Sequence, residues 1–271
     1  MTQKFSSNKN FINSFRKVLS VYRFSNWYYY IGFVLMGFLI GSPIAMFNGL
    51  IVLTHILLIC FLLAYAYSFN DFNDKFHKRK FFLAPLLLTF LILLSFKISQ
   101  IVVSIFFLLI VTLYSSKYIR LKAKPFVCTV CNSLGFSLIF LIGYLHASQI
   151  DFSGFLFMLL FFSFNTVAQL IHELVHMKED RKTTITTAIF LGIKKVKVFS
   201  IIFLLLAQIV SICLFYLHLV NMIFLITTTI FTTFFIIKIY KENKINEEFR
   251  KKYRNFGIIA GLIYLLNFLI L

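Results

Sequence analysis

Two groups of acidic residues in this chain of 271 residues have the spacing of metal ligands. Asp71 and Asp74 lie three residues apart near the end of one apolar stretch, so they share one face of a helix. Glu173, His176 and Asp180 are related in the same way near the end of another apolar stretch. One such group alone would be an ordinary charged helix end, but two at equivalent places favour a site. Because Mg²⁺ is bound by a few carboxylates together with phosphate oxygens, the two groups predict a magnesium site for a diphosphate.

A basic segment between the two acidic groups could supply phosphate ligands. It runs from Tyr118 to Lys122 and contains Arg120. Arginine and lysine neutralise phosphate oxygens, although positive charge at this place also fits a simple membrane-topology signal. Two polar residues inside apolar stretches, Asn132 and Asn165, could orient a second substrate. A hydrogen bond between helices is the more common role of such residues, and the sequence leaves both roles open.

Long apolar stretches position these groups. The chain is 60% hydrophobic and has a mean hydropathy of +0.90, which excludes an ordinary soluble domain. Most of the stretches have about the 17–25 residues that a helix needs to cross a bilayer, and they are apolar on all faces, unlike β-barrel strands. The sequence therefore predicts an all-α polytopic membrane protein with nine transmembrane helices around a central cavity, at residues 27–44, 48–69, 81–97, 99–116, 126–147, 153–177, 197–218, 220–239 and 256–271.

The positions of the basic residues predict the orientation of this protein. Of the 27 lysines and arginines, all but Lys97 fall in the N-terminal segment or in every second gap between the apolar stretches. Since basic loops stay on the cytoplasmic side, we expect a cell-membrane protein with its N-terminus cytoplasmic and its C-terminus outside. Both acidic groups then face the cytoplasm. Topology and attraction to the lipid bilayer account for the net charge of +18, so no nucleic-acid partner is predicted.

The chain divides into a leader and one membrane domain. Residues 1–26 are basic, contain no cleavable apolar stretch, and are predicted to be a cytoplasmic leader, part of which could lie flat on the membrane. Residues 27–271 form the nine-helix domain. Its last basic segment, residues 238–254, is predicted to be a solvated charged helix with a structural role.

The combination resembles the UbiA superfamily of intramembrane prenyltransferases, and three motifs carry the resemblance. Residues Asn70 to Lys78 follow the pattern N-D-x-x-D-x-x-x-D after the second span. Tyr118 to Lys122 matches Y-x-x-x-K after the fourth span. Glu173 to Arg181 follows D-x-x-D-x-x-x-D-R after the sixth span. Each motif alone is weak, but their order along a nine-span chain is fairly specific.

The resemblance implies Mg²⁺-dependent transfer of a prenyl group from a prenyl diphosphate to an acceptor in the membrane. Asp71, Asp74 and Asp180, helped by Glu173, would hold Mg²⁺ on the diphosphate. Lys122 would stabilise the charge that grows on the departing group. The remaining substrate contacts that the resemblance suggests are Asn70, Lys78, Tyr118, Arg120, Asn132, Asn165, His176 and Arg181. The sequence leaves the acceptor and the length of the prenyl chain open.

Departures from the family pattern leave a second possibility. Lys78 and His176 stand where the motifs carry acidic residues, and Glu173 stands at another of these positions. Fewer carboxylates put full occupancy by metal in doubt, although Lys78 could itself face a phosphate oxygen. A catalytically degenerate member of the superfamily therefore stays open as an alternative.

A zinc metalloprotease is the other alternative. His172 to His176 reads H-E-x-x-H, which on a helix places two zinc ligands on one face with a glutamate as general base. Such an enzyme needs a third ligand and a site that water can reach. This hypothesis explains neither the segment Asn70 to Asp74 nor the segment Tyr118 to Lys122, so prenyl transfer is preferred.

Overall fold

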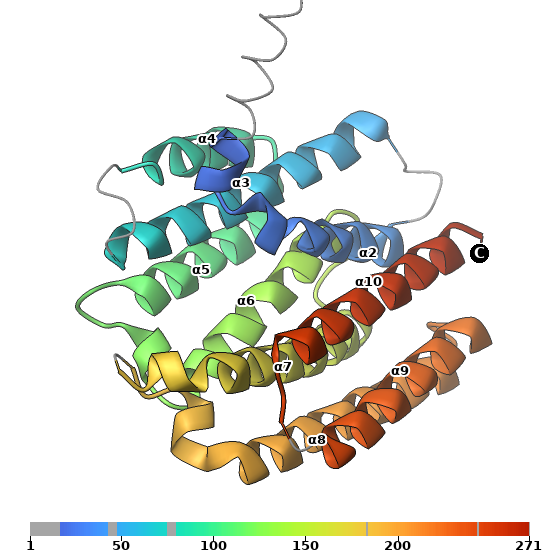
Figure 1. Cartoon of the computed structure of the whole chain (residues 1–271). Helices are drawn as coiled ribbons and strands as arrows, with labels where there is room; N and C mark the ends of the chain where they lie inside the picture. The colour runs from blue at the N-terminus through green and yellow to red at the C-terminus, as the bar shows by residue number, and fades with distance from the viewer. Residues whose placement is uncertain (1–16, 43–47, 75–79, 183, 243, 271) are drawn as a thin grey trace, which may run out of the picture.

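The computed structural model describes residues 17–42, 48–74, 80–182, 184–242 and 244–270, and this part of the chain is helical with no strand (Figure 1). Its helices, in chain order, are α2 (Ile31–Gly41), α3 (Gly49–Asn73), α4 (Leu83–Leu93), α5 (Ile98–Ser115), α6 (Val127–Tyr144), α7 (Phe152–Asp180), α8 (Thr187–Tyr216), α9 (Met222–Lys241) and α10 (Glu247–Ile270). Three short 3₁₀ turns accompany them: η1 (Phe24–Asn26), η2 (Tyr28–Tyr30) and η4 (Leu121–Ala123). The all-α prediction is confirmed.

Each predicted span contains or overlaps one of the helices α2 to α10, but some boundaries were wrong. The seventh span was predicted to start at residue 197 and the ninth at residue 256, whereas α8 starts at Thr187 and α10 at Glu247. Hydropathy missed the start of α8 because Gly192 and the lysines at 194, 195 and 197 interrupt the apolar stretch, and it missed the start of α10 because that start is rich in charged residues. The segment 238–254 is consequently not one solvated helix, because α9 ends inside it and α10 begins there.

Among the described residues, six helices, α3 and α5 to α9, are long and apolar enough to cross a membrane by length and composition. Two apolar helices are shorter, at Tyr28–Gly41 and Leu83–Leu93. A multi-pass membrane protein fits this set. The total of nine crossings and the orientation of the termini stay predictions.

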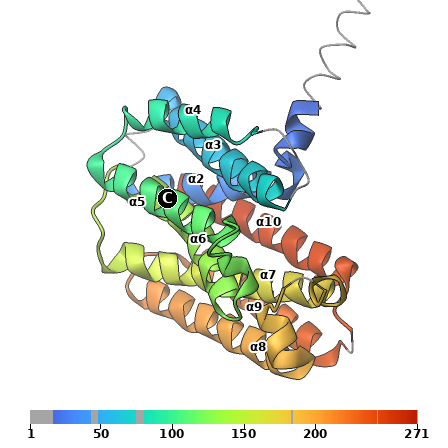
Figure 2. The ribbon, with the colours of Figure 1, turned by 90° about the vertical axis from the view of Figure 1, so that its left-hand side faces the viewer.

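Helices α6 and α7 occupy the middle of the bundle (Figure 2). Each is 67% buried over its most apolar window, twice the share of α8 or α9. Figures 1 and 2 show α3 and α4 on one side of this pair and α8 and α9 on the other. Helix α10 packs against both α2 and α7, so the first and last helices of the domain are neighbours.

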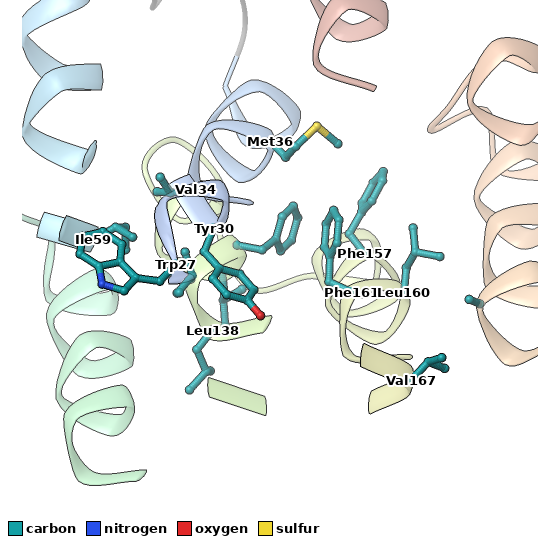
Figure 3. Close-up of a cluster of buried hydrophobic side chains, with 14 of the residues drawn as sticks. Trp27, Tyr30, Val34, Met36, Ile59, Leu138, Phe157, Leu160, Phe161 and Val167 are labelled. Carbon is teal, nitrogen blue, oxygen red and sulfur yellow. The ribbon is translucent and has the colours of Figure 1, made fainter. Parts of the chain in front are cut away.

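Glycines allow the backbones of α2 and α6 to come into direct contact. A Cβ atom at Gly37 would collide with the carbonyl oxygen of Phe140, and one at Gly143 would collide with the carbonyl oxygen of Val34. Small residues at helix crossings of this kind are typical of membrane proteins. Aromatic and aliphatic side chains fill the space around this contact (Figure 3): Trp27, Tyr30, Met36, Leu138, Phe157 and Phe161.

The end of the predicted leader packs against the membrane domain. Residues 17–21 are helical, and the Tyr22 hydroxyl donates to the Phe81 carbonyl oxygen at 3.3 Å. The indole nitrogen of Trp27 donates to the Tyr22 carbonyl oxygen at 2.7 Å. These contacts fix the chain just before α2. Residues 1–16 lie outside the described part of the chain, so the cytoplasmic location of the leader stays a prediction.

Candidate active site

A cavity of about 1190 Å³ lies among α2, α3, α5, α6, α7 and α10. Its lining includes most of the site residues predicted from the sequence, and these come from segments up to about a hundred positions apart. Aromatic side chains such as Phe33, Phe107, Phe161 and Phe231 line its apolar part. The nominated residues in the lining are Asn70, Asp74, Arg120, Lys122, Asn132, Asn165, Glu173, His176 and Asp180.

Lys122 joins the first two motifs. Its Nζ atom lies 2.6 Å from each carboxylate oxygen of Asp74 and 2.8 Å from Oδ1 of Asn70. Ser115 Oγ donates to the same Asn70 oxygen at 3.1 Å, and the Arg120 guanidinium lies 4.0 Å from Asp74. The Lys122 side chain is only 13% exposed. A carboxylate, an amide oxygen and two cations therefore meet at one end of the cavity.

Local backbone geometry explains how this group forms. Asn70 and Asp74 are four residues apart at the end of α3, so they lie one above the other on the same helix face. Arg120 has a left-handed conformation with φ 44°, which turns the chain into η4 and brings Lys122 back toward α3. A non-glycine residue at positive φ is uncommon and is strained.

Asp71 does not line the cavity. It follows Asn70 directly and so points about 100° away around the helix axis. Its side chain is almost fully buried, and Oδ1 lies 2.9 Å from the Arg23 guanidinium of the leader. Arg23 itself lines the cavity. Of the three aspartates expected to converge, Asp74 and Asp180 line the same cavity, whereas Asp71 forms an ion pair outside its lining.

Helix α7 presents a polar face to the cavity. Its residues recur at intervals of four, three, four and four: Asn165, Gln169, His172, His176 and Asp180. These positions follow the period of an α-helix, so they form one stripe along α7. Asp180 is the last residue of α7 and thus completes the polar stripe that begins at Asn165.

Glu173 has a structural role in this arrangement. It is 2% exposed; Oε1 accepts hydrogen bonds from Thr129 Oγ1 at 2.8 Å and Gln169 Nε2 at 3.1 Å. Oε2 accepts from the backbone N–H of Ala188 at 3.0 Å, in the first turn of α8. This carboxylate therefore satisfies a free N–H group at a helix start and ties α6, α7 and α8 together. Its role as a magnesium ligand stays a prediction that these contacts do not favour.

Two other residues that the sequence suggested lie outside the cavity lining, and a third is not among the described residues. Tyr118 is 97% exposed and outside the cavity lining. Arg181 is exposed, with its guanidinium 3.9 Å from Met177 Sδ, and also lies outside the lining. Lys78 lies outside the described residues. The motif pattern could not foresee this, because it fixes positions along the chain and not the direction of each side chain.

The two histidines of H-E-x-x-H lie side by side without a third ligand. Their ring centroids are 4.6 Å apart, and both residues line the cavity. Arg250 Nη1 donates to His172 Nδ1 at 2.6 Å. Among the described residues, no group of three or more His, Cys, Asp or Glu side chains could hold a metal ion. The geometry does not support a zinc protease.

The sequence reasoning missed the basic start of α10. Arg250, Lys251 and Arg254 line the cavity, although their segment was expected to be solvated. Arg250, Arg254, Gly257 and Gly261 recur at intervals of four, three and four and all line the cavity. This continuation of one helix face from the charged part into the apolar part was the signal that could have revealed them.

Comparison with solved structures supports the fold. The structure of a digeranylgeranylglyceryl phosphate synthase is 23% identical, with a TM-score of 0.72 over 95% of this chain and 98% of that one. A UbiA homolog from Archaeoglobus fulgidus bound to GPP and Mg²⁺ is 16% identical, with a TM-score of 0.73 over 94% of this chain and 100% of that one. The same homolog bound to Cd²⁺ is 17% identical, with a TM-score of 0.77 over 94% of this chain and 98% of that one.

Comparison with curated proteins gives no significant match. The model of the UbiA prenyltransferase family, however, matches residues 77–259, which is well over half of the chain. The match begins at residue 77, so it includes neither Asn70 nor the two aspartates of the first motif. It includes the basic segment that holds Lys122 and the whole polar face of α7. The chain belongs to the UbiA prenyltransferase family.

Proposed function

We propose that this protein transfers a prenyl group from a prenyl diphosphate to an acceptor, with Mg²⁺ as cofactor. The observation that carries the proposal is the joining of Asn70, Asp74 and Lys122 at the end of a cavity that Asp180 also lines. The A. fulgidus homolog, bound to GPP and Mg²⁺ in its own structure, supports the choice of donor and metal. The asymmetry of the basic loops supports a site at the cytoplasmic face of the cell membrane.

Asp74 and Asp180 would hold the magnesium, with Asn70 as a neutral oxygen ligand. The residues fit this ion, because Mg²⁺ is bound through one or two carboxylates plus substrate phosphates and needs no all-protein cage. When bound, the metal neutralises charge on the departing diphosphate. Lys122 already forms an ion pair with Asp74, so its ammonium lies where a diphosphate beside that carboxylate would arrive. Arg120 is the second cation within reach.

The apolar part of the cavity would hold the prenyl chain. It is lined by phenylalanines, and a Cβ atom at Gly32, Gly257 or Gly261 would meet no atom within 4 Å. These glycines leave open space beside α2 and α10 that a hydrocarbon chain could fill. A cavity that excludes water would also protect an allylic cation from hydrolysis.

The test is a transfer assay on purified protein with radiolabelled geranyl and longer prenyl diphosphates and a panel of acceptors. We expect release of diphosphate and a prenylated product with Mg²⁺ and neither with a chelator. Donor binding without turnover for every acceptor would instead indicate a degenerate member. Stoichiometric zinc together with cleavage of a membrane peptide would overturn the proposal.

The matched variants for this assay are Asp74→Asn and Glu248→Gln. Both remove one carboxylate charge from the cytoplasmic side of the molecule as we orient it. Asp74 lines the cavity, whereas Glu248 pairs with Lys252 at 2.6 Å on the exposed side of α10. Activity should fall at least about 100-fold in the first variant, because a positioned charge in the site is lost, and stay unchanged in the second.

A further inference from the structure

A chain of hydrogen bonds runs from the end of the basic segment to Glu173. The backbone N–H of Phe126 donates to Thr187 Oγ1 at 2.9 Å. The hydroxyl oxygens of Thr187 and Thr129 lie 2.6 Å apart, and Thr129 Oγ1 donates to Glu173 Oε1 at 2.8 Å. The chain therefore joins the turn before α6, the first residue of α8, the first turn of α6 and a buried carboxylate on α7.

The direction of this chain is fixed, because a hydroxyl group has only one hydrogen to donate. Thr187 accepts from the Phe126 N–H, and the hydroxyl hydrogen of Thr129 goes to Glu173. The hydrogen between the two hydroxyl oxygens must therefore come from Thr187. Every step points toward Glu173, so the chain has to end on an acceptor. A carboxylate accepts at both oxygens, and Oε2 accepts the Ala188 N–H at the same time.

The other end of the chain holds a strained turn. Phe126 has φ 61° and ψ −46°, and the Val127 N–H donates to the Pro125 carbonyl oxygen across it at 2.7 Å. A three-residue turn with its central residue at positive φ is rare and strained when that residue has a side chain. Such a conformation persists only where surrounding contacts hold it. The Phe126 ring also packs on Phe190, so α8 holds both the backbone and the side chain of this residue.

The strained turn ends the segment that carries Lys122. This segment leaves α5 after Ser115, and Lys122 lies in η4, four positions before Phe126. From there its Nζ atom reaches Asp74 at 2.6 Å. A shift of the turn would move the ammonium group relative to Asp74. Since a misplacement of about 1 Å in a site costs on the order of 100-fold in rate, contacts that hold this turn can control activity from a distance.

We infer that Glu173 is a positioning residue for Lys122 and not a ligand of magnesium. It acts through two threonines, Thr129 and Thr187, which hold the turn at Phe126. The inference rests on the proposed function and adds a residue that controls the donor site without touching the donor. Both oxygens of Glu173 already accept hydrogen bonds inside the protein, and these bonds stay in place when metal and donor bind.

Thr187→Val tests the chain without removing a carboxylate. The substitution keeps the size of the side chain but removes the acceptor for the Phe126 N–H. Thr187→Ser keeps a hydroxyl at this place and should behave like the wild type. Thr166→Val is the matched control, because Thr166 is equally buried but donates to the Phe162 carbonyl of its own helix, outside the cavity lining.

Glu173→Gln breaks the chain at its acceptor, because an amide cannot accept at both ends. With saturating Mg²⁺, we expect kcat for prenyl transfer to fall about tenfold or more in Glu173→Gln and Thr187→Val, because Lys122 is displaced. Thr187→Ser and Thr166→Val should stay within about twofold of the wild type. In a Lys122→Met background, the two damaging variants should each cost less than about threefold, since the group that they position is absent.

Metal affinity separates positioning from ligation. The full chain in phosphatidylcholine nanodiscs is saturated with geranyl thiodiphosphate, a donor analogue that transfers poorly, and titrated with Mn²⁺, whose free form is followed by electron paramagnetic resonance. Glu173→Gln and Thr187→Val should alter the Mn²⁺ affinity by less than about threefold, whereas Asp180→Asn should weaken it about tenfold or more.

Hydrogen exchange followed by mass spectrometry gives a readout that does not depend on activity. The Phe126 amide is held by Thr187, so peptides that cover residues 117–128 should exchange faster in Thr187→Val and Glu173→Gln than in the wild type. Peptides from α5 should exchange at the wild-type rate, which shows that the fold persists. Thr187→Val carries the test alone if Glu173→Gln does not fold.

Three results would overturn the inference and leave the proposed function intact. The first is a loss of Mn²⁺ affinity in Glu173→Gln that Thr187→Val does not share, which would make Glu173 a metal ligand. The second is wild-type exchange and wild-type kcat in Thr187→Val. The third is an equal loss of kcat with and without Lys122. A wild-type protein that neither binds the donor analogue nor transfers a prenyl group would overturn both proposals together.

Discussion

Lys122 connects two parts of the chain that lie about fifty residues apart. Its ammonium group contacts Asp74 and Asn70, which end α3, and it comes from the turn after α5. The ion pair has little water around it, because the lysine and aspartate side chains are 13% and 23% exposed. Charges held in such surroundings interact more strongly than those on the surface, so the pair can position a diphosphate.

We expect Lys122→Met to lower kcat about 100-fold, because a cation that faces the departing diphosphate is lost. Lys124→Met is the control, since Lys124 belongs to the same basic segment but is exposed and outside the cavity lining. Steady-state kinetics with saturating Mg²⁺ and geranyl diphosphate measures both. Equal loss in the two variants would mean that only the general charge of the loop matters.

Asp71 and Asp74 should behave differently when each is changed to Asn. Asp71→Asn breaks a buried ion pair with Arg23, which is 37% exposed, so it should destabilise the fold by about 1–3 kcal/mol. Asp74→Asn should instead remove Mg²⁺-dependent turnover with a smaller change in stability. Thermal unfolding and activity, measured on the same preparations, separate the two effects. If Asp71→Asn abolished activity in a protein of normal stability, Asp71 would act in the site, as the sequence motif implies.

At the scale of helices, hydropathy was sufficient to predict that one helix lies in each apolar stretch, from α2 to α10. The exact starts of α8 and α10 were not predictable in this way. Gly192, with φ 76°, breaks α8 near its start, and Glu173 stabilises that start from α7. Such contacts depend on tertiary packing and leave no hydrophobic pattern.

The candidate site was predictable in part for the same reason. Asp74, Lys122 and Asp180, which the motifs named, line one cavity. The position of Asp71 around the axis of α3 points it to Arg23 and not into the cavity, and Tyr118 lies in the exposed turn after α5. The sequence did not predict that the cations of α10 line the cavity, because this depends on the packing of the last helix against α2 and α7.

Two glycines should respond oppositely to the same substitution by leucine. At Gly37 a side chain would meet the backbone of α6, so Gly37→Leu should prevent folding or cost at least about 3 kcal/mol. At Gly257 it would enter open space in the cavity, so Gly257→Leu should fold normally. It should lower kcat/KM for long prenyl diphosphates more than for geranyl diphosphate. Equal activity on all chain lengths would mean that the prenyl chain does not run along α10.

At the scale of the whole molecule, basic residues alternate along the chain. They gather in the N-terminal segment and around every second gap between the apolar stretches, and Asp74 and Asp180 lie at two of these places. The polar end of the cavity should therefore open to the cytoplasm, where soluble Mg²⁺ and diphosphate are available. The apolar remainder of the cavity lies among helices that suit a bilayer.

Single cysteines can test this orientation in right-side-out vesicles, in a variant from which the four native cysteines have been removed. Ile150→Cys lies before α7 and Tyr118→Cys lies after α5, and both positions are well exposed, at 66% and 97%. A membrane-impermeant maleimide should label the first and reach the second only after the vesicles are opened. The reverse pattern would place the candidate site outside.

The most direct measurement is the structure of the protein with geranyl thiodiphosphate and Mn²⁺ in place of Mg²⁺, with the metal located by its anomalous scattering. The predicted result is manganese about 2.2 Å from oxygens of Asp74, Asp180 and the diphosphate, with Lys122 against a phosphate oxygen. Metal held by His172 and His176, or a diphosphate bound away from Asp74 and Lys122, would contradict it.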